Sequence, residues 1–232
     1  MRNCFNLIRN YKLEFLIKAG IKEIKRKIWR EKIKNSYSQN YEDLIIDKLL
    51  NKKRGKYLEI GAYHPTRLSN TYRFYKKGWR GIVIEPNPEV KFLFEKYRPR
   101  DKYLGVGISN KNKKLNYYQF LIPALNTFSK INANQSIKKG HKLVGVKKIN
   151  TKNIKEIAEK NIDFLSVDTE GFDELILKSW PWNKYYPKVI CVEDEGININ
   201  YLLKNKGYIL KDKTKSNSIY FQKLKPWDGR RQ

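Results

Sequence analysis

The chain has 232 residues, of which 40% are hydrophobic, and a formal net charge of +27. This composition excludes a disordered chain, and no run approaches the roughly 18 apolar residues of a membrane-spanning helix. The positive charge suggests a polyanionic partner such as nucleic acid or a membrane surface, and it would attract anionic substrates. The composition offers another explanation, because an A/T-rich genome also encodes abundant Lys, Asn, Ile and Tyr. The only cysteines, Cys4 and Cys191, form no disulfide framework, which favours a cytoplasmic protein.

Residues 1–35 are strongly basic and are expected to form an extension before a single domain at 36–232. Ile17, Ile21, Ile24 and Ile28 recur at helical spacing among lysines and arginines, which predicts an amphipathic helix. Such a helix either attaches the protein to the inner face of an anionic membrane or to a glycan-assembly complex, or it packs its apolar stripe on the domain.

From Ser38 onward the hydrophobic pattern alternates between helical and strand-like periods. In chain order it predicts a helix at 42–50, a strand at 56–60, a helix around 74–75 that ends at Gly78, a strand at 81–85, a helix at 90–97, strands at 103–108 and 115–121, an irregular loop or lid at 122–142, a strand at 143–149, a helix at 151–160, strands at 164–168 and 189–193, a helix at 199–204, and β-like runs at 207–211 and 218–224. This alternation predicts an α/β fold with a mostly parallel sheet, helices on both faces and an antiparallel hairpin at the end.

Ligands of such sheets bind at the carboxyl ends of the strands, where this basic chain places acidic residues. The first turn, "GAYHP", lacks the spaced glycines of a dinucleotide site, and the chain has no phosphate-binding loop. A phosphate-free ligand is therefore expected, with Gly61 allowing its close approach. Glu85 lies 24 positions after Gly61, where an acid can accept hydrogen bonds from ribose hydroxyls; NAD and S-adenosylmethionine both carry a ribose.

Three runs of sequence carry a family resemblance. The segments "SQNYEDLIID", "YLEIGAYHPTRLSNTYRFYKKGWRGIVIEPNP" and "IDFLSVDTEGFDELILKSW" resemble the FkbM-type methyltransferases over roughly residues 38–193. The resemblance implies a Rossmann-like class I methyltransferase fold, with a seven-stranded sheet and an antiparallel C-terminal hairpin. It also implies S-adenosylmethionine as methyl donor and a hydroxyl of a sugar, sugar nucleotide or glycan intermediate as acceptor.

The resemblance further implies a set of cofactor-binding residues after the first three strands: Glu59, Gly61, Asn70, Thr71, Glu85, Ser109 and Asn110. Glu59 and Gly61 would meet the methionine part of the cofactor, and Glu85 its ribose. Asn70 and Thr71 would line the same pocket or cap a helix. Ser109 and Asn110 would lie near the adenine or form a plain turn.

Methyl transfer to a sugar hydroxyl benefits from a general base, and the candidates are His64, Asp168, Glu170 and Asp173. His64 directly follows the cofactor turn and has the intrinsic pKa suited to neutral pH, or it packs on Pro65. Asp168 closes an apolar strand, whereas Glu170 equally suits a helix N-terminus. A second mechanism uses a divalent cation such as Mg²⁺, held by Asp168 with Glu193 or Asp194, to activate the acceptor.

Two other functions stay open from the sequence. An RNA or DNA methyltransferase is suggested by the charge and by Tyr117, Tyr118 and Phe120, because aromatic residues among cations stack on single strands; strand-like spacing equally makes them core residues. A catalytically inactive adaptor for glycan assembly or a membrane surface would dock through residues 1–35. The expected partner of the enzyme is an anionic, sugar-type acceptor.

Overall fold

A computed structural model describes residues 36–193 and 197–223. The chain divides into two compact units, Met1–Ser36 and Tyr37–Gln232, and the description below concerns the second. The helix predicted within residues 1–35 and the candidate metal ligand Asp194 both lie outside the described residues. Within the described ranges, no helix has the length and apolar character needed to cross a membrane.

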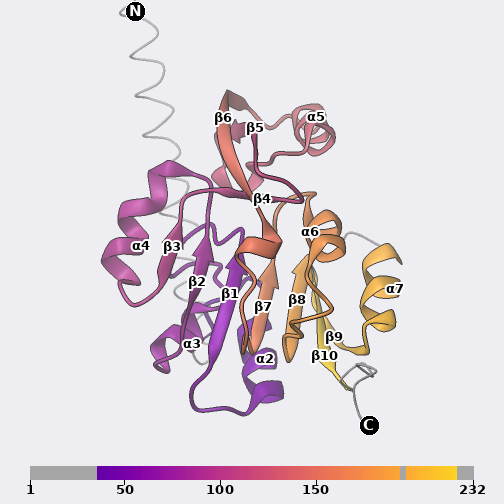
Figure 1. Cartoon of the computed structure of the whole chain (residues 1–232). Helices are drawn as coiled ribbons and strands as arrows, with labels where there is room; N and C mark the ends of the chain where they lie inside the picture. The colour runs from indigo at the N-terminus through magenta and orange to yellow at the C-terminus, as the bar shows by residue number, and fades with distance from the viewer. Residues whose placement is uncertain (1–35, 194–196, 224–232) are drawn as a thin grey trace, which may run out of the picture. The chain divides into compact units, whose positions relative to one another are not determined.

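A seven-stranded sheet, in the order β3-β2-β1-β7-β8-β10-β9, forms the centre of the domain (Figure 1). Its strands are β1 (Lys56–Ile60), β2 (Arg80–Ile84), β3 (Lys102–Leu104), β7 (Phe164–Val167), β8 (Val189–Glu193), β9 (Tyr208–Lys213) and β10 (Asn217–Gln222). The neighbouring strands β3, β2, β1, β7 and β8 pair in parallel, whereas β10 is antiparallel to both β8 and β9. The predicted mostly parallel sheet with a final antiparallel hairpin is therefore confirmed.

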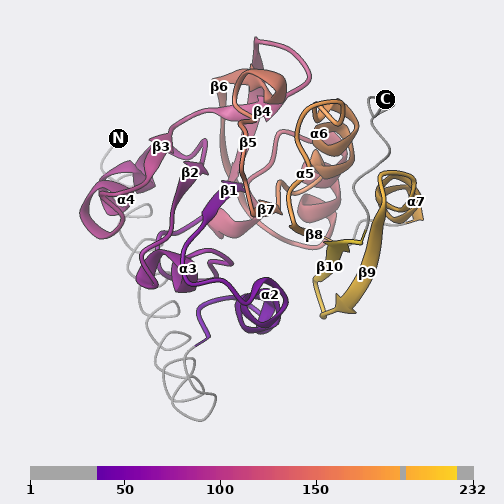
Figure 2. The same ribbon diagram turned by 60° about the horizontal axis from the view of Figure 1, so that its bottom comes forward.

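Alternation along the buried strands creates two hydrophobic layers. In β1, Leu58 and Ile60 join one core and Tyr57 joins the other, because successive side chains point to opposite faces of a sheet. One face is covered by α2 (Glu42–Leu50), α3 (Tyr72–Lys76) and α4 (Lys91–Tyr97). The opposite face is covered by α6 (Asp173–Ser179) and α7 (Ile197–Asn205), and Figure 2 shows α2 and α3 across the sheet from α6.

A second, three-stranded sheet lies beyond the carboxyl ends of the central strands (Figure 1). It contains β4 (Gly107–Ser109), β5 (Lys113–Phe120) and β6 (Leu143–Asn153), in the order β4-β6-β5. Between β5 and β6 lie the short 3-10 helix η2 (Pro123–Leu125) and the helix α5 (Lys130–Lys138). We refer to residues 113–153 as the cap.

Most errors of the sequence-based prediction lie in the cap or directly beside it. The strand expected at 103–108 is two short strands in different sheets, and the segment 122–142, expected to be irregular, contains α5. The helix expected at 151–160 is wrong, because β6 continues to Asn153, where it pairs with Ser109, and only the 3-10 turn η3 (Ile154–Glu156) follows. Strand pairing with distant residues overrides local helical spacing there.

Candidate active site

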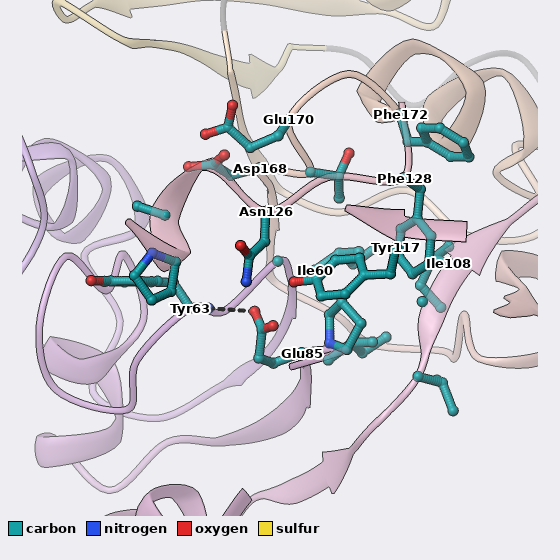
Figure 3. Close-up of a pocket in the computed structure, with 18 of the residues that line it drawn as sticks. Ile60, Tyr63, Glu85, Ile108, Tyr117, Asn126, Phe128, Asp168, Glu170 and Phe172 are labelled. Carbon is teal, nitrogen blue, oxygen red and sulfur yellow. Dashed lines mark hydrogen bonds between the residues drawn. The ribbon is translucent and has the colours of Figure 1, made fainter. Parts of the chain in front are cut away.

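A pocket opens at the carboxyl ends of β1, β2 and β7, beneath the cap. Its empty volume is about 820 Å³, part of which is open solvent. Ile60, Glu85 and Asp168 line it from the central strands, and Tyr117 and Phe128 line it from the cap (Figure 3). The predicted location at the strand ends is thus where the cavity lies.

Glu85 is the buried acid of this pocket. Its two carboxylate oxygens accept hydrogen bonds from the backbone N–H groups of Tyr63 (2.8 Å) and Asn87 (2.7 Å). Only 6% of the residue is exposed, and this burial raises the pKa of the Glu85 carboxyl from 4.5 to about 7, against the opposing effect of the two N–H donors. Because a carboxylate has about four acceptor positions, Glu85 retains lone pairs for ligand hydroxyls.

The cap reaches Glu85 through two side chains. Figure 3 shows the Tyr117 and Asn126 side chains directed toward the Glu85 carboxylate. Burial, followed by the charge of Glu85, raises the pKa of Tyr117, so its hydroxyl remains a donor. Asn126 is itself held by the Phe120 N–H, which donates to its side-chain oxygen at 2.7 Å.

The turn after β1 is confined by the neighbouring strand end. Gly61 has a φ of +81°, and a Cβ built on it would lie 1.6 Å from the carbonyl oxygen of Asp168. No side chain fits in that space, so only glycine allows the β1 and β7 ends to approach each other at the pocket. The close approach of a ligand to Gly61, which the sequence suggested, stays a prediction.

The loop after β7 carries two acids into the pocket lining, Asp168 and Glu170. Glu170 has the left-handed φ of 53°, which a non-glycine residue keeps only when its surroundings hold it. Here the cap holds it, because Thr127 Oγ1 (2.7 Å) and Asn132 Nδ2 (2.9 Å) both donate to the Glu170 carbonyl oxygen. Asp173, which is fully buried and accepts a hydrogen bond from Thr169 Oγ1 at 2.8 Å, fixes the other end of the loop.

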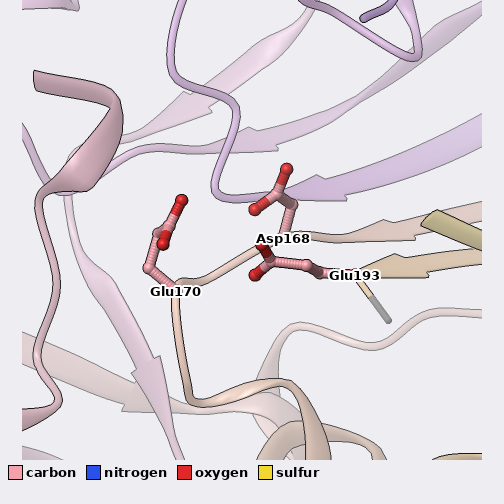
Figure 4. A group of neighbouring side chains, drawn as sticks. All are labelled: Asp168, Glu170 and Glu193. Atoms are coloured by element: carbon pink, nitrogen blue, oxygen red, sulfur yellow. The ribbon is translucent and has the colours of Figure 1, made fainter. Parts of the chain in front are cut away.

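Asp168, Glu170 and Glu193 form an acidic cluster (Figure 4). One carboxylate oxygen from each lies within 4.8 Å of the others, and all three residues are half-buried. The structure thus brings together two of the three predicted metal ligands, Asp168 and Glu193, and adds Glu170, which the sequence suggested only as a base. Carboxylates in this arrangement can accept sugar hydroxyls, take up a proton or hold a cation.

His64 is half-buried in the turn that follows Gly61. Its Nδ1 atom accepts hydrogen bonds from the backbone N–H groups of Thr66 and Arg67, both at 3.2 Å. These donors place the proton of the neutral ring on Nε2. His64 therefore stabilises its own turn, and its predicted role as a base stays a prediction.

Glu59 faces away from the pocket. In β1 it shares the face of Tyr57, where Arg98 Nη1 lies 3.1 Å from a Glu59 carboxylate oxygen and both side chains are almost completely buried. Thr71 Oγ1 donates to Glu59 as well, and Arg98 also pairs with Asp101 at 2.7 Å. This buried network joins β1 to the end of α4. The methionine-binding role of Glu59 and the pocket-lining role of Thr71 stay predictions.

The other predicted cofactor residues also lie outside the pocket lining formed by the described residues. Asn70 donates to Ser166 Oγ at 3.0 Å, and the N–H of Tyr72 at the start of α3 donates to Ser69 Oγ rather than to Asn70. Ser109 is fully buried beside exposed Asn110, whereas the preceding residues of β4, Gly107 and Ile108, line the cavity.

The pocket residues that sequence reasoning missed include Tyr117, Asn126 and Phe128. The aromatic content of β5 was visible in the sequence, but its inner and outer faces depend on pairing with β6. Tyr117 and Phe120 are each 3% exposed. They therefore do not provide the exposed stacking surface on which the RNA or DNA methyltransferase hypothesis relied.

Comparison with known proteins identifies the family. The profile described as "Methyltransferase FkbM domain" matches residues 59–210, well over half of the chain. One similar solved structure is a TehB-like SAM-dependent methyltransferase from Corynebacterium glutamicum, with a TM-score of 0.43, 10% identity, and coverage of 89% of this chain and 99% of the other. Another is 1,6-didemethyltoxoflavin-N1-methyltransferase from Burkholderia thailandensis, with bound S-adenosylhomocysteine, a TM-score of 0.40, 10% identity, and coverage of 90% and 86%.

No curated protein matches the chain significantly. The family profile extends from Glu59 in β1 to Leu210 in β9, and so includes the ends of β1, β2 and β7 that build the pocket. The sheet order and the antiparallel β10 agree with the class I methyltransferase fold that the sequence motifs implied. The chain belongs to the FkbM family of S-adenosylmethionine-dependent methyltransferases.

Proposed function

We propose that the protein is an O-methyltransferase that methylates a hydroxyl of a sugar, a sugar nucleotide or a glycan intermediate. The observation that carries this proposal is the acidic cluster at the pocket. Asp168 and Glu170 line the same cavity as the buried Glu85, and Glu193 lies beside them. A buried acid suited to ribose hydroxyls thus adjoins carboxylates suited to the hydroxyls of an acceptor.

The lining of the cavity suits the chemistry of S-adenosylmethionine. Glu85 retains acceptor positions for the ribose hydroxyls, and Gly61 leaves the β1 turn free of side-chain atoms. Ile108 and Phe128 supply apolar walls of the kind that bind an adenine ring. When bound, S-adenosylmethionine supplies an electrophilic methyl group on a sulfonium, whose carbon–sulfur bond breaks as the carbon–oxygen bond to the acceptor forms.

The residues of the chain contribute orientation and a proton acceptor. The Asp168 and Glu170 carboxylates would bind the acceptor hydroxyl and take its proton during attack, which is typically worth about 10²–10⁴-fold in rate. The cap side chains Tyr117 and Phe128 cover the cavity and exclude water. We assign the base to this pair of acids rather than to His64, because His64 Nδ1 is engaged by two backbone donors.

The test is transfer of labelled methyl groups from S-adenosylmethionine to pools of sugar nucleotides and glycan precursors. Wild-type protein should give a product in which the label resides on oxygen, and Asp168→Asn should lower turnover by about 10²-fold or more while cofactor binding is retained. Labelling on nitrogen or carbon, or full activity of Asp168→Asn, would contradict the proposal.

A divalent cation such as Mg²⁺ is a variant of the same mechanism. Asp168 and Glu193, with Glu170, would hold the ion, which would orient the acceptor oxygen and favour its deprotonation. The matched measurement compares turnover with chelator and with added Mg²⁺ in wild type and in Glu193→Gln. Turnover that chelator leaves unchanged would remove the ion from the mechanism and leave the carboxylates as bases.

A further inference from the structure

We propose that the cap docks the enzyme onto an anionic lipid bilayer. This surface is separate from residues 1–35, and it lies on the described part of the protein. The proposal rests on the charge of the cap, on the aliphatic side chains that it exposes, and on its position over the pocket.

The charge of the cap is of one sign only. Residues 113–153 contain nine lysines and no arginine, aspartate or glutamate, so all 23 acidic residues of the chain lie outside this segment. A general surplus of lysine across the chain does not explain a local absence of acids. Such a surface is attracted by the negative potential of anionic lipid headgroups, and each lysine near the bilayer adds to the affinity of the protein for it.

The cap also exposes aliphatic side chains, whose contact with water is unfavourable. Five of the large hydrophobic residues that are markedly exposed in the described part of the chain belong to it: Ile122, Ile131, Ile137, Val144 and Val146. The most exposed is Ile131 at 70%. An exposed apolar patch with cationic surroundings is typical of proteins that insert side chains into the interfacial layer of a membrane.

Backbone contacts hold four of these residues around one region. The Leu121 N–H donates to the Lys142 carbonyl (2.9 Å), which places Ile122 beside the connection between α5 and β6. Ile137 lies in the last turn of α5, next to that connection. Val144 and Val146 alternate with less exposed residues in β6 and therefore share one face of the strand. These exposed residues belong to the end of α5, the start of β6 and the segment before α5, and Figure 1 shows where α5 and β6 lie.

The kind of exposed residue distinguishes a membrane from a nucleic acid. Binding of single strands uses exposed aromatic rings on which bases stack, but Tyr117 and Phe120 of the cap are buried, and Tyr118 and Phe128 are half-buried. The exposed residues are Ile and Val, which gain from transfer into lipid and offer nothing to a base. An anionic bilayer is therefore the partner that matches both the charge and the apolar surface.

Docking in this way would bring the pocket close to the lipid surface. The segment between β5 and α5 carries exposed Ile122 and, a few residues later, Asn126 and Phe128 of the pocket lining. The cap would thus connect the membrane to the cavity, which suits an acceptor anchored in that membrane. Docking itself does not depend on the identity of the acceptor.

The experiment is sedimentation of the full chain with vesicles of phosphatidylglycerol and phosphatidylcholine, compared with phosphatidylcholine alone. One variant removes four exposed cap charges, Lys130→Gln, Lys138→Gln, Lys139→Gln and Lys148→Gln; a second removes apolar surface, Ile131→Gln, Val144→Thr and Val146→Thr. The matched controls are Lys53→Gln, Lys184→Gln, Lys204→Gln and Lys215→Gln for charge, and Tyr201→Gln with Leu210→Thr for apolar surface; all of these residues are exposed outside the cap.

The wild type should bind the anionic vesicles, and each cap variant should bind about tenfold or more weakly, whereas both control variants should bind as the wild type does. Circular dichroism and cofactor titration check that every variant is folded. Equal binding by cap and control variants, or no binding of the wild type, would overturn the proposal. Tighter, cap-dependent binding to a polyuridine oligonucleotide than to vesicles would also overturn it, in favour of nucleic acid.

Discussion

The raised pKa of Glu85 makes a prediction about stability that the substitution Glu85→Gln tests. Burial lifts this pKa from 4.5 to about 7, so between these pH values the folded protein holds a proton that the unfolded chain releases. The free energy of unfolding must then fall as the pH rises through this window and stay level above it. A rise from 4.5 to about 7 corresponds to at most about 3 kcal/mol.

The assay is urea denaturation at pH 5 and at pH 8 without cofactor. Relative to Glu85→Gln, which cannot ionise, wild type should lose up to about 3 kcal/mol of stability between the two pH values. Glu89→Gln is the matched control, because Glu89 is exposed and lies only four residues away. Its pH dependence should follow that of the wild type. Parallel curves for wild type and Glu85→Gln would refute the account of a carboxyl that burial holds protonated near neutrality.

The remaining predictions concern the β1 turn, the buried network and His64. Gly61→Ala should destabilise the protein by more than about 2 kcal/mol in urea denaturation and abolish cofactor binding, since backbone strain and the collision of the new Cβ with Asp168 act together. Gly78→Ala should lower the free energy of unfolding clearly less, because Gly78 has a similar φ of +87° but open space around its Cβ. Equal losses of stability in the two variants would contradict the role of close approach. Arg98→Met should cost about 3–5 kcal/mol, because two buried carboxylates lose their partner, whereas Lys52→Met removes only an exposed pair and should cost under about 1 kcal/mol. His64→Ala should retain cofactor binding and most methyl transfer in the labelled assay; binding that is intact with transfer lost would make His64 the base.

The central sheet could be predicted from the sequence because its signals are local. The short apolar runs ending in Ile60, Ile84, Val167 and Glu193 correspond to β1, β2, β7 and β8 within one or two residues. A fully buried parallel strand is apolar on both faces, so its pattern is recognisable without knowledge of its neighbours. The number of strands came with the family resemblance, and their order was not predicted, since no local pattern encodes it.

The cap was predicted poorly for the opposite reason. The strands expected at 115–121 and 143–149 are present as β5 and β6, but their partners and the extension of β6 to Asn153 depend on pairing between distant residues, such as Lys113 with Thr151. As a result, the contributions of Tyr117 and Asn126 to the pocket were not foreseen. The side of the sheet to which these residues belong is a consequence of tertiary pairing.

Within the site, the sequence located the acids at the strand ends but did not separate their roles. Glu59 and Glu85 both end apolar strands, yet the structure directs Glu59 into an ion pair with Arg98 and Glu85 into the cavity. Glu59 and Glu85 point in different directions because successive side chains of a strand alternate between the two faces of the sheet. Glu59 is the penultimate residue of β1 and shares the face of Tyr57, whereas Glu85 follows the last residue of β2, where the chain turns over the sheet edge.

The most direct test of the cofactor site is a calorimetric titration with S-adenosylmethionine of wild type, Glu85→Ala and the control Glu89→Ala. At pH 8, where the Glu85 carboxyl is ionised, we expect binding to wild type and to the control, and an affinity about 100-fold lower or worse for Glu85→Ala, because hydrogen bonds to a charged group contribute about 1.5–3 kcal/mol each. A dissociation constant that Glu85→Ala leaves unchanged, or the absence of binding to wild type, would contradict the assignment of this pocket as the cofactor site.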